Sequence, residues 1–85
     1  MLSTLKSRLA LVQELRKRGF YVRWHAYEFL LGYNGRLIGT LLLEPSKGKA
    51  NLFLIEYSGV VIQLVKEAVE VAGGMVKLEV FTLKS

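Results

Sequence analysis

The chain has 85 residues, 52% of them hydrophobic, with a mean hydropathy of +0.32, which predicts one small domain over residues 1–85. No apolar run reaches the roughly 18 residues of a membrane-spanning helix, and no export signal is recognisable, so we expect a cytoplasmic protein without membrane contact. The lack of cysteine excludes disulfides and thiolate metal sites, while the net charge of +5 favours nucleic acid as a partner.

Residues 3–18 have the apolar spacing of an amphipathic helix. Leucine or valine recurs at three- and four-residue intervals, and most charged side chains fall between these positions. Ser3 or Thr4 can cap the start of this helix. Gly19 suits the position just after its end, where the basic RKR segment at 16–18 also favours the negative end of the helix dipole.

Two stretches rich in aromatic and aliphatic residues follow and predict a hairpin. Residues 20–33 form either one long strand or two strands with a bend near position 25. Residues 36–44 form the returning strand, because the Asn-Gly pair at 34–35 is the strongest short signal for a two-residue turn.

The turn geometry fixes an expected register between these strands. Counting from the Asn-Gly turn places Glu28 opposite Leu41, and cross-strand partners share a face of the sheet. The same counting pairs His25 with Glu44 and puts Glu44 on the other face from Glu28.

The second half of the chain predicts a loop, a strand, a helix and a strand. Residues 45–49 contain proline and glycine and end the preceding strand, and residues 51–57 read as the next strand. A second helix runs from a Ser58 cap to about Ala72. Residues 75–83 alternate apolar and charged side chains, which is typical of a half-buried strand.

The second helix has only a narrow polar face. An apolar surface this wide predicts contact with the sheet on one side and with a second subunit on the other. The alternative is a helix buried in the core of its own chain. The residues expected at a homodimer interface are Val61, Leu64, Val65, Ala68 and Val69.

The order of these elements predicts an α+β (α/β) fold with a mixed sheet flanked by two helices. LVQELRKRGFYV, the Asn-Gly hairpin, PSKGKANLFL and the AGG that ends the second helix follow one another along the chain. With these features the chain resembles the archaeal Holliday junction resolvases over nearly its whole length. The resemblance implies a restriction-endonuclease-like αβββαβ core and a homodimer with a role in DNA repair and recombination.

Resolvases of this family hold magnesium with carboxylates on the first helix and the hairpin, and stabilise developing charge with a lysine. The corresponding places here are held by Arg8, Glu28, Leu41 and Leu43. The resemblance therefore implies an inactive member, not an enzyme, with no metal site and no cofactor. In place of the metal site we expect an ion pair between Arg8 and Glu28.

The first functional interpretation is DNA binding without catalysis. Lysine and arginine side chains would hold phosphates and carry little sequence information. The candidate contacts are Lys6, Arg8, Arg16, Lys17, Arg18, Arg23, Arg36, Lys47 and Lys49.

Other interpretations stay open. A protein-interaction module could dimerise through the apolar helix or pair with an active resolvase, without binding DNA itself. Aromatic residues on the hairpin could stack bases, although core packing is the preferred interpretation. A facing His25 and Glu44 could serve an enzyme of another type, but without a nucleophile a structural contact is preferred.

Overall fold

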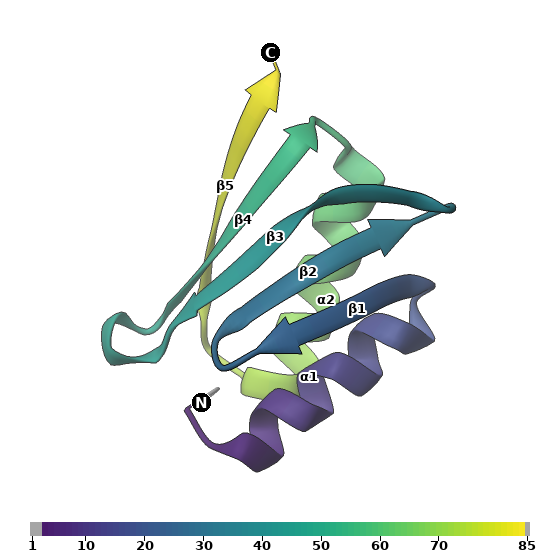
Figure 1. Cartoon of the computed structure of the whole chain (residues 1–85). Coiled ribbons are helices and arrows are strands. Elements are labelled where there is room, and N and C mark those ends of the chain that lie inside the picture. Colours follow the sequence, from purple (N-terminus) through teal and green to yellow (C-terminus); the bar gives the residue numbers. More distant parts are fainter. Residues whose placement is uncertain (1–2, 85) are drawn as a thin grey trace.

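A computed structural model describes residues 3–84 and shows a five-stranded sheet with both helices on one face (Figure 1). Strands β1 to β4 are antiparallel neighbours in chain order, and β5 lies parallel to β4 at the edge. The predicted α+β class with a mixed sheet and two flanking helices is confirmed. The elements are α1 (Leu5–Lys17), β1 (Phe20–His25), β2 (Glu28–Tyr33), β3 (Arg36–Glu44), a 3₁₀ turn (Pro45–Lys47), β4 (Lys49–Glu56), α2 (Gly59–Gly73) and β5 (Lys77–Lys84).

Both helices begin and end at the residues that their local sequence favours. The Thr4 and Ser58 hydroxyl oxygens each accept a hydrogen bond from the backbone N–H three residues further on. Gly19 and Gly74 follow the helices with positive φ values of 96° and 72°, which glycine adopts without strain. Within residues 3–84, neither helix is long and apolar enough to cross a membrane.

Residues 20–33 form two strands, β1 and β2, and not one long strand. The chain reverses at Ala26 and Tyr27, with Ala26 at a φ of 54°, and His25 pairs with Glu28. The reversal places odd-numbered residues of β1 and even-numbered residues of β2 on the same face. Tyr21 is therefore exposed on the open face, whereas Phe29 is fully buried beneath the helices.

A β-bulge interrupts the pairing of β2 with β3. The ladder starts at the expected turn, but Gly32 pairs with Leu37 while Leu31 pairs with Gly39. Ile38 is thus an extra residue in β3. A single extra residue exchanges the two faces for the rest of the strand.

The bulge makes the predicted register beyond it wrong. Glu28 lies opposite Leu42, and Leu41 lies opposite Phe29. Leu41 and Leu43 consequently point into the core, with 0% and 4% of their surface exposed. Glu44 pairs with Lys49 instead of His25, and it lies on the same face as Glu28.

The core lies between the covered face of the sheet and the two helices. Its members from α2 include Val61, Val65, Ala68 and Val69, all at most 4% exposed, and Leu64 packs partly buried against them. These side chains leave almost no surface for a second subunit, so the proposed dimer interface on α2 is corrected. One side of the helix is buried in the core of its own chain, because two helices must cover one face of five strands, whereas Val60 and Val71 on its other sides are exposed.

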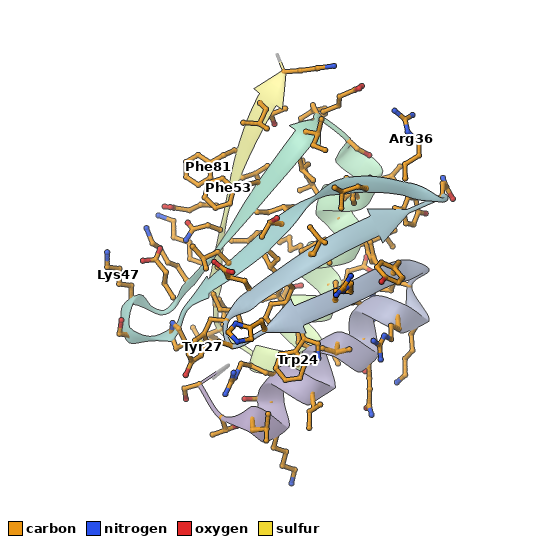
Figure 2. All side chains as sticks on the ribbon, in the orientation of Figure 1. Trp24, Tyr27, Arg36, Lys47, Phe53 and Phe81 are labelled. Atoms are coloured by element: carbon orange, nitrogen blue, oxygen red, sulfur yellow. The ribbon has the colours of Figure 1, made fainter. Side chains whose placement is uncertain are left out.

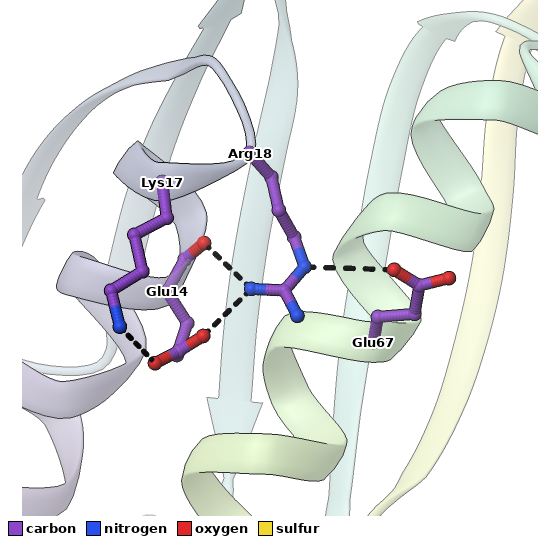
Figure 3. Close-up of polar contacts among 4 residues, drawn as sticks. All are labelled: Glu14, Lys17, Arg18 and Glu67. Carbon is purple, nitrogen blue, oxygen red and sulfur yellow. Dashed lines mark hydrogen bonds and ion pairs between the residues drawn. The ribbon is translucent and has the colours of Figure 1, made fainter.

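An arginine just after α1 links the two helices (Figure 3). Arg18 donates from Nη1 to a Glu14 carboxylate oxygen at 2.7 Å and to the Glu14 carbonyl oxygen at 3.0 Å. Its Nε lies 3.6 Å from a carboxylate oxygen of Glu67 on α2. Hydrogen bonds from Arg18 and then Lys17 lower the pKa of Glu14.

Candidate nucleic-acid interface

A shallow hollow of about 580 Å³ opens beside the edge strand β1, and we call it the β1 hollow. One wall comes from α1 through Arg16, and the floor comes from the first three strands. Figure 2 shows Trp24 at this edge, next to α1. The lining residues are Arg16, Val22, Arg23, Trp24, His25, Glu28, Leu30 and Thr40.

Two arginines of α1 are anchored on the backbone of this edge. Arg16 donates from Nη2 to the carbonyl oxygen of Val22 at 3.2 Å. Arg8 donates from Nη1 to the carbonyl oxygen of Ala26 at 2.8 Å, and its guanidinium lies 4.4 Å from the centre of the Tyr27 ring. Such contacts hold guanidinium groups in place while keeping their charge.

The positive charge at this edge is not neutralised by carboxylates. Arg8, Arg16 and Arg23 form no salt bridge with any carboxylate in the described chain, and Glu28 is the one acidic residue that lines the hollow. The expected ion pair between Arg8 and Glu28 is therefore wrong. Arg8 instead binds a backbone carbonyl and two aromatic rings.

The other candidate DNA contacts lie elsewhere. Lys17 and Arg18 pair with Glu14 on the side of α1 that faces α2. Arg36 lies at the tip of the β2–β3 hairpin, and Lys47 lies at the β3–β4 connection (Figure 2). The structure thus places Arg16 and Arg23 together in the β1 hollow, with Arg8 further along the same edge at Ala26 and Lys6 exposed on the first turn of α1. None of the remaining candidates lines the hollow: Lys17, Arg18, Arg36, Lys47 and Lys49.

A polar cluster on the open face of β3 to β5 neutralises the cations of that region. Asn51 is 5% exposed and donates to a Glu44 carboxylate oxygen at 2.5 Å, which lowers the pKa of Glu44. Lys49 lies 3.2 Å from a Glu79 oxygen. This contact lowers the pKa of Glu79 and raises the pKa of Lys49.

The four positions matched to nuclease chemistry do not converge. Leu41 and Leu43 point into the core, while Glu28 is exposed on the opposite face and Arg8 lies at the end of β1. Across residues 3–84, no three histidine, aspartate, glutamate or cysteine side chains gather closely enough to hold a metal ion. The predicted pairing of His25 with Glu44 is also wrong, because His25 lies opposite Glu28 and Glu44 lies opposite Lys49.

Trp24 is a residue of this surface that the sequence reasoning missed. Its ring stacks on Phe29 at 5.7 Å between centres, with 7° between the planes, and it lines the hollow between Arg23 and His25. Alternation along residues 20–25 assigns Trp24 to the covered face with Phe20 and Val22, so the sequence gives no signal that it borders the hollow. Even-numbered positions there are apolar, and the odd-numbered ones carry polar or charged groups.

The fold and this surface define a small α+β protein with an open sheet face and a cationic edge. Comparison with known proteins gives it no family: no family model, no curated protein and no solved structure matches the chain.

Proposed function

We propose that this chain is a non-catalytic nucleic-acid-binding protein whose β1 hollow holds a sugar–phosphate backbone. The observation that carries the proposal is that Arg16 and Arg23 in the hollow, and Arg8 further along the same edge, have no carboxylate partner in residues 3–84. The net charge of +5 attracts polyanions at long range. At short range, guanidinium groups bind phosphate oxygens with directed hydrogen bonds.

The anchoring of the arginines supports binding over a simple solubilising role. A mobile surface arginine loses rotamer freedom when it binds phosphate, and that loss weakens the complex. Arg8 and Arg16 are already held by the Ala26 and Val22 carbonyl oxygens. Each guanidinium still has further N–H donors that can reach a ligand.

The nucleic acid proposed is DNA, contacted through its backbone and with little preference for sequence. The resemblance to junction resolvases supports branched DNA and a role as an accessory factor in repair or recombination. This proposal does not need the metal site of that family, because phosphate contacts alone supply most of non-specific binding.

The experiment compares a four-way junction, a duplex and a single strand by fluorescence anisotropy over a range of salt. We expect binding that weakens steeply as salt rises, since counterions are released on binding. Arg23→Ala should lower the affinity several-fold and reduce the salt slope by about one. Arg36→Ala is the matched control, because it removes the same charge from an exposed strand residue outside the hollow.

Two results would contradict the proposal. One is the absence of binding to all three DNA forms at low salt. The other is an equal loss of affinity in the Arg23→Ala and Arg36→Ala variants, which would indicate attraction by net charge without a site.

A protein-interaction role is the second candidate function. It is favoured by apolar side chains exposed on β5, with Phe81 at 47% and Leu83 at 78% exposure. These residues lie at the edge of the sheet opposite the β1 hollow, so the two roles do not compete for one surface.

A further inference from the structure

The two edges of the sheet differ in whether their backbone is covered. Along β1, Arg16 and Arg8 bind the carbonyl oxygens of Val22 and Ala26. Along β5, the backbone pairs with β4, and Lys77 also donates to the carbonyl oxygen of Gly48 just before β4. In the part of the chain that the structure describes, β5 is the last strand of the sheet (Figure 1). A free edge strand presents a row of unpaired backbone N–H and C=O groups that can pair with another strand.

The side chains of β5 do not protect this edge. Residues 80–83 read Val-Phe-Thr-Leu, without a charge between Glu79 and Lys84. Phe81 and Leu83 are exposed on the open face, and Val80 is 37% exposed on the other face. Edges that stay free usually carry a charge, a proline or a bulge in the middle of the strand, and β5 has none of these within 80–83.

A ring stack runs across the sheet and ends at this edge. Phe53 on β4 and Phe81 on β5 lie with ring centres 5.1 Å apart and planes 17° apart (Figure 2). This separation is close to the distance of about 4.8 Å between neighbouring strands. The two rings therefore face each other along the direction that joins the strands, and the outer face of Phe81 looks past the edge.

We propose that β5 pairs with β5 of a second copy of this chain, antiparallel and centred on Phe81. The two five-stranded sheets then join into one, and the ring stack continues into Phe81 of the partner subunit. The isologous arrangement is self-complementary, as the symmetry of a two-subunit assembly requires.

Charge and strand register favour a second copy of β5 as the partner strand, with Phe81 at the two-fold axis. With Phe81 at the two-fold axis, Glu79 lies opposite Leu83 of the partner subunit, and no like charges meet. A register centred on Glu79 would bring two carboxylates together. The lysines of this region, Lys47, Lys49 and Lys77, already pair with Glu44 or Glu79. They are therefore not free to bind phosphates, which disfavours single-stranded nucleic acid as the occupant.

The expected dimer is reversible. Pairing along one edge strand buries less than the total of about 1,200 Å² typical of the smaller stable interfaces. The fraction of dimer should therefore rise with concentration from the micromolar to the millimolar range. Homodimerisation was expected through Val61, Leu64, Val65, Ala68 and Val69 of α2, which pack into the core of their own chain, and the β5 edge offers a different surface for it.

The first test is sedimentation equilibrium without nucleic acid, so its result is independent of DNA binding. The unmodified chain should show a mass that rises towards twice the monomer mass. Phe81→Lys should remain a monomer, because two lysines would meet at the axis. Leu37→Lys, an exposed apolar strand residue at 56% exposure on β3, is the matched control and should still dimerise.

A second test covers the case in which Phe81→Lys fails to fold. The chain has no cysteine, so Phe81→Cys introduces a single thiol. Directly opposed strand residues are close enough for a disulfide, so mild oxidation should give a covalent dimer. Leu37→Cys should give none at the same concentration.

Three outcomes would overturn the proposal. One is a monomer mass for the unmodified chain at every concentration. Another is equal cross-linking of the Phe81→Cys and Leu37→Cys variants. The third is an unchanged monomer mass together with a specific loss of single-strand binding in Phe81→Lys, which would assign the stack to nucleic acid.

Discussion

Gly39 in β3 lies directly against the carbonyl oxygen of Phe53 in β4, and a Cβ atom at position 39 would overlap that oxygen. The contact follows immediately after the bulge at Ile38. Close approach of two backbones is one of the few requirements that only glycine meets. The bulge, and with it the register of the rest of β3, therefore depends on this glycine.

Gly39→Ala should destabilise the protein by about 2 kcal/mol or more, because strands β3 and β4 must separate to admit the methyl group. Urea unfolding followed by circular dichroism measures the change. Gly59→Ala is the control, since the added Cβ would lie 3.7 Å from the nearest atom, the Tyr57 hydroxyl oxygen. That variant should be neutral or slightly stabilised, and equal losses in both variants would contradict the close contact.

Glutamate and lysine at positions 41 and 43, where the resemblance to resolvases implies a metal ligand and the charge-stabilising lysine, should unfold the chain without creating a metal site. Leu41→Glu with Leu43→Lys places two charges in the core, where the native side chains are 0% and 4% exposed. Burying an unpaired charge costs more than a small domain can lose. Circular dichroism should show loss of structure, with or without magnesium.

The control for this experiment is Leu42→Lys. Leu42 lies between the other two but faces the open side of the sheet, opposite Glu28. We expect this variant to fold. A folded Leu41→Glu/Leu43→Lys protein that binds magnesium would show that the register without the bulge is the correct one.

Asn51→Asp should destabilise the protein at neutral pH by about 1–3 kcal/mol, because a buried hydrogen bond is replaced by repulsion. The Asn51 amide donates to Glu44, and a carboxylate there has no proton to donate. In the Asn51→Asp variant, protonation of either carboxylate restores a hydrogen-bond donor between positions 51 and 44. The loss of stability should therefore shrink as the pH falls below neutral. Thermal unfolding at several pH values measures it, and a loss independent of pH would argue against the contact.

The native protein should lose stability on both sides of a broad plateau in pH. The pKa of Glu14, Glu44 and Glu79 is lowered by hydrogen bonds from Arg18, Asn51 and Lys49, respectively. Their stabilisation is complete above the ordinary value of 4.5 and is lost as the pH falls through the lowered values. The pKa of Lys49 is raised, so its contribution is complete below 10.5 and is lost as the pH rises beyond that value.

The urea midpoint measured across this range tests the assignment. Glu79→Gln should flatten the acid limb and also reduce the alkaline loss, because it removes the partner of Lys49. Glu70→Gln is the matched control, since Glu70 makes no salt bridge within residues 3–84. An unchanged profile in Glu79→Gln would mean that the cluster does not contribute to stability.

The candidate site was only partly predictable, and the reason is the turn at Ala26. A strand that runs straight through position 26 would place Tyr21 and Phe29 on one face. The reversal separates them and turns Arg23 and His25 towards the hollow. An alanine with positive φ gives no sequence signal, because the residues typical of that conformation are glycine, asparagine and aspartate.

The sequence by itself determined the helices, their caps, the Asn-Gly hairpin and the class of fold, because these depend on side-chain periodicity and on the conformational preferences of a few residues. Only the tertiary structure decided which charges are neutralised and which side chains face the core. Arg18 and Arg23 look alike in the sequence, yet one meets Glu14 and Glu67 and the other meets no carboxylate in the described chain. The physical reasons are tertiary: Arg18 reaches Glu67 because α1 packs against α2, and one extra residue in β3 exchanges the two faces of that strand.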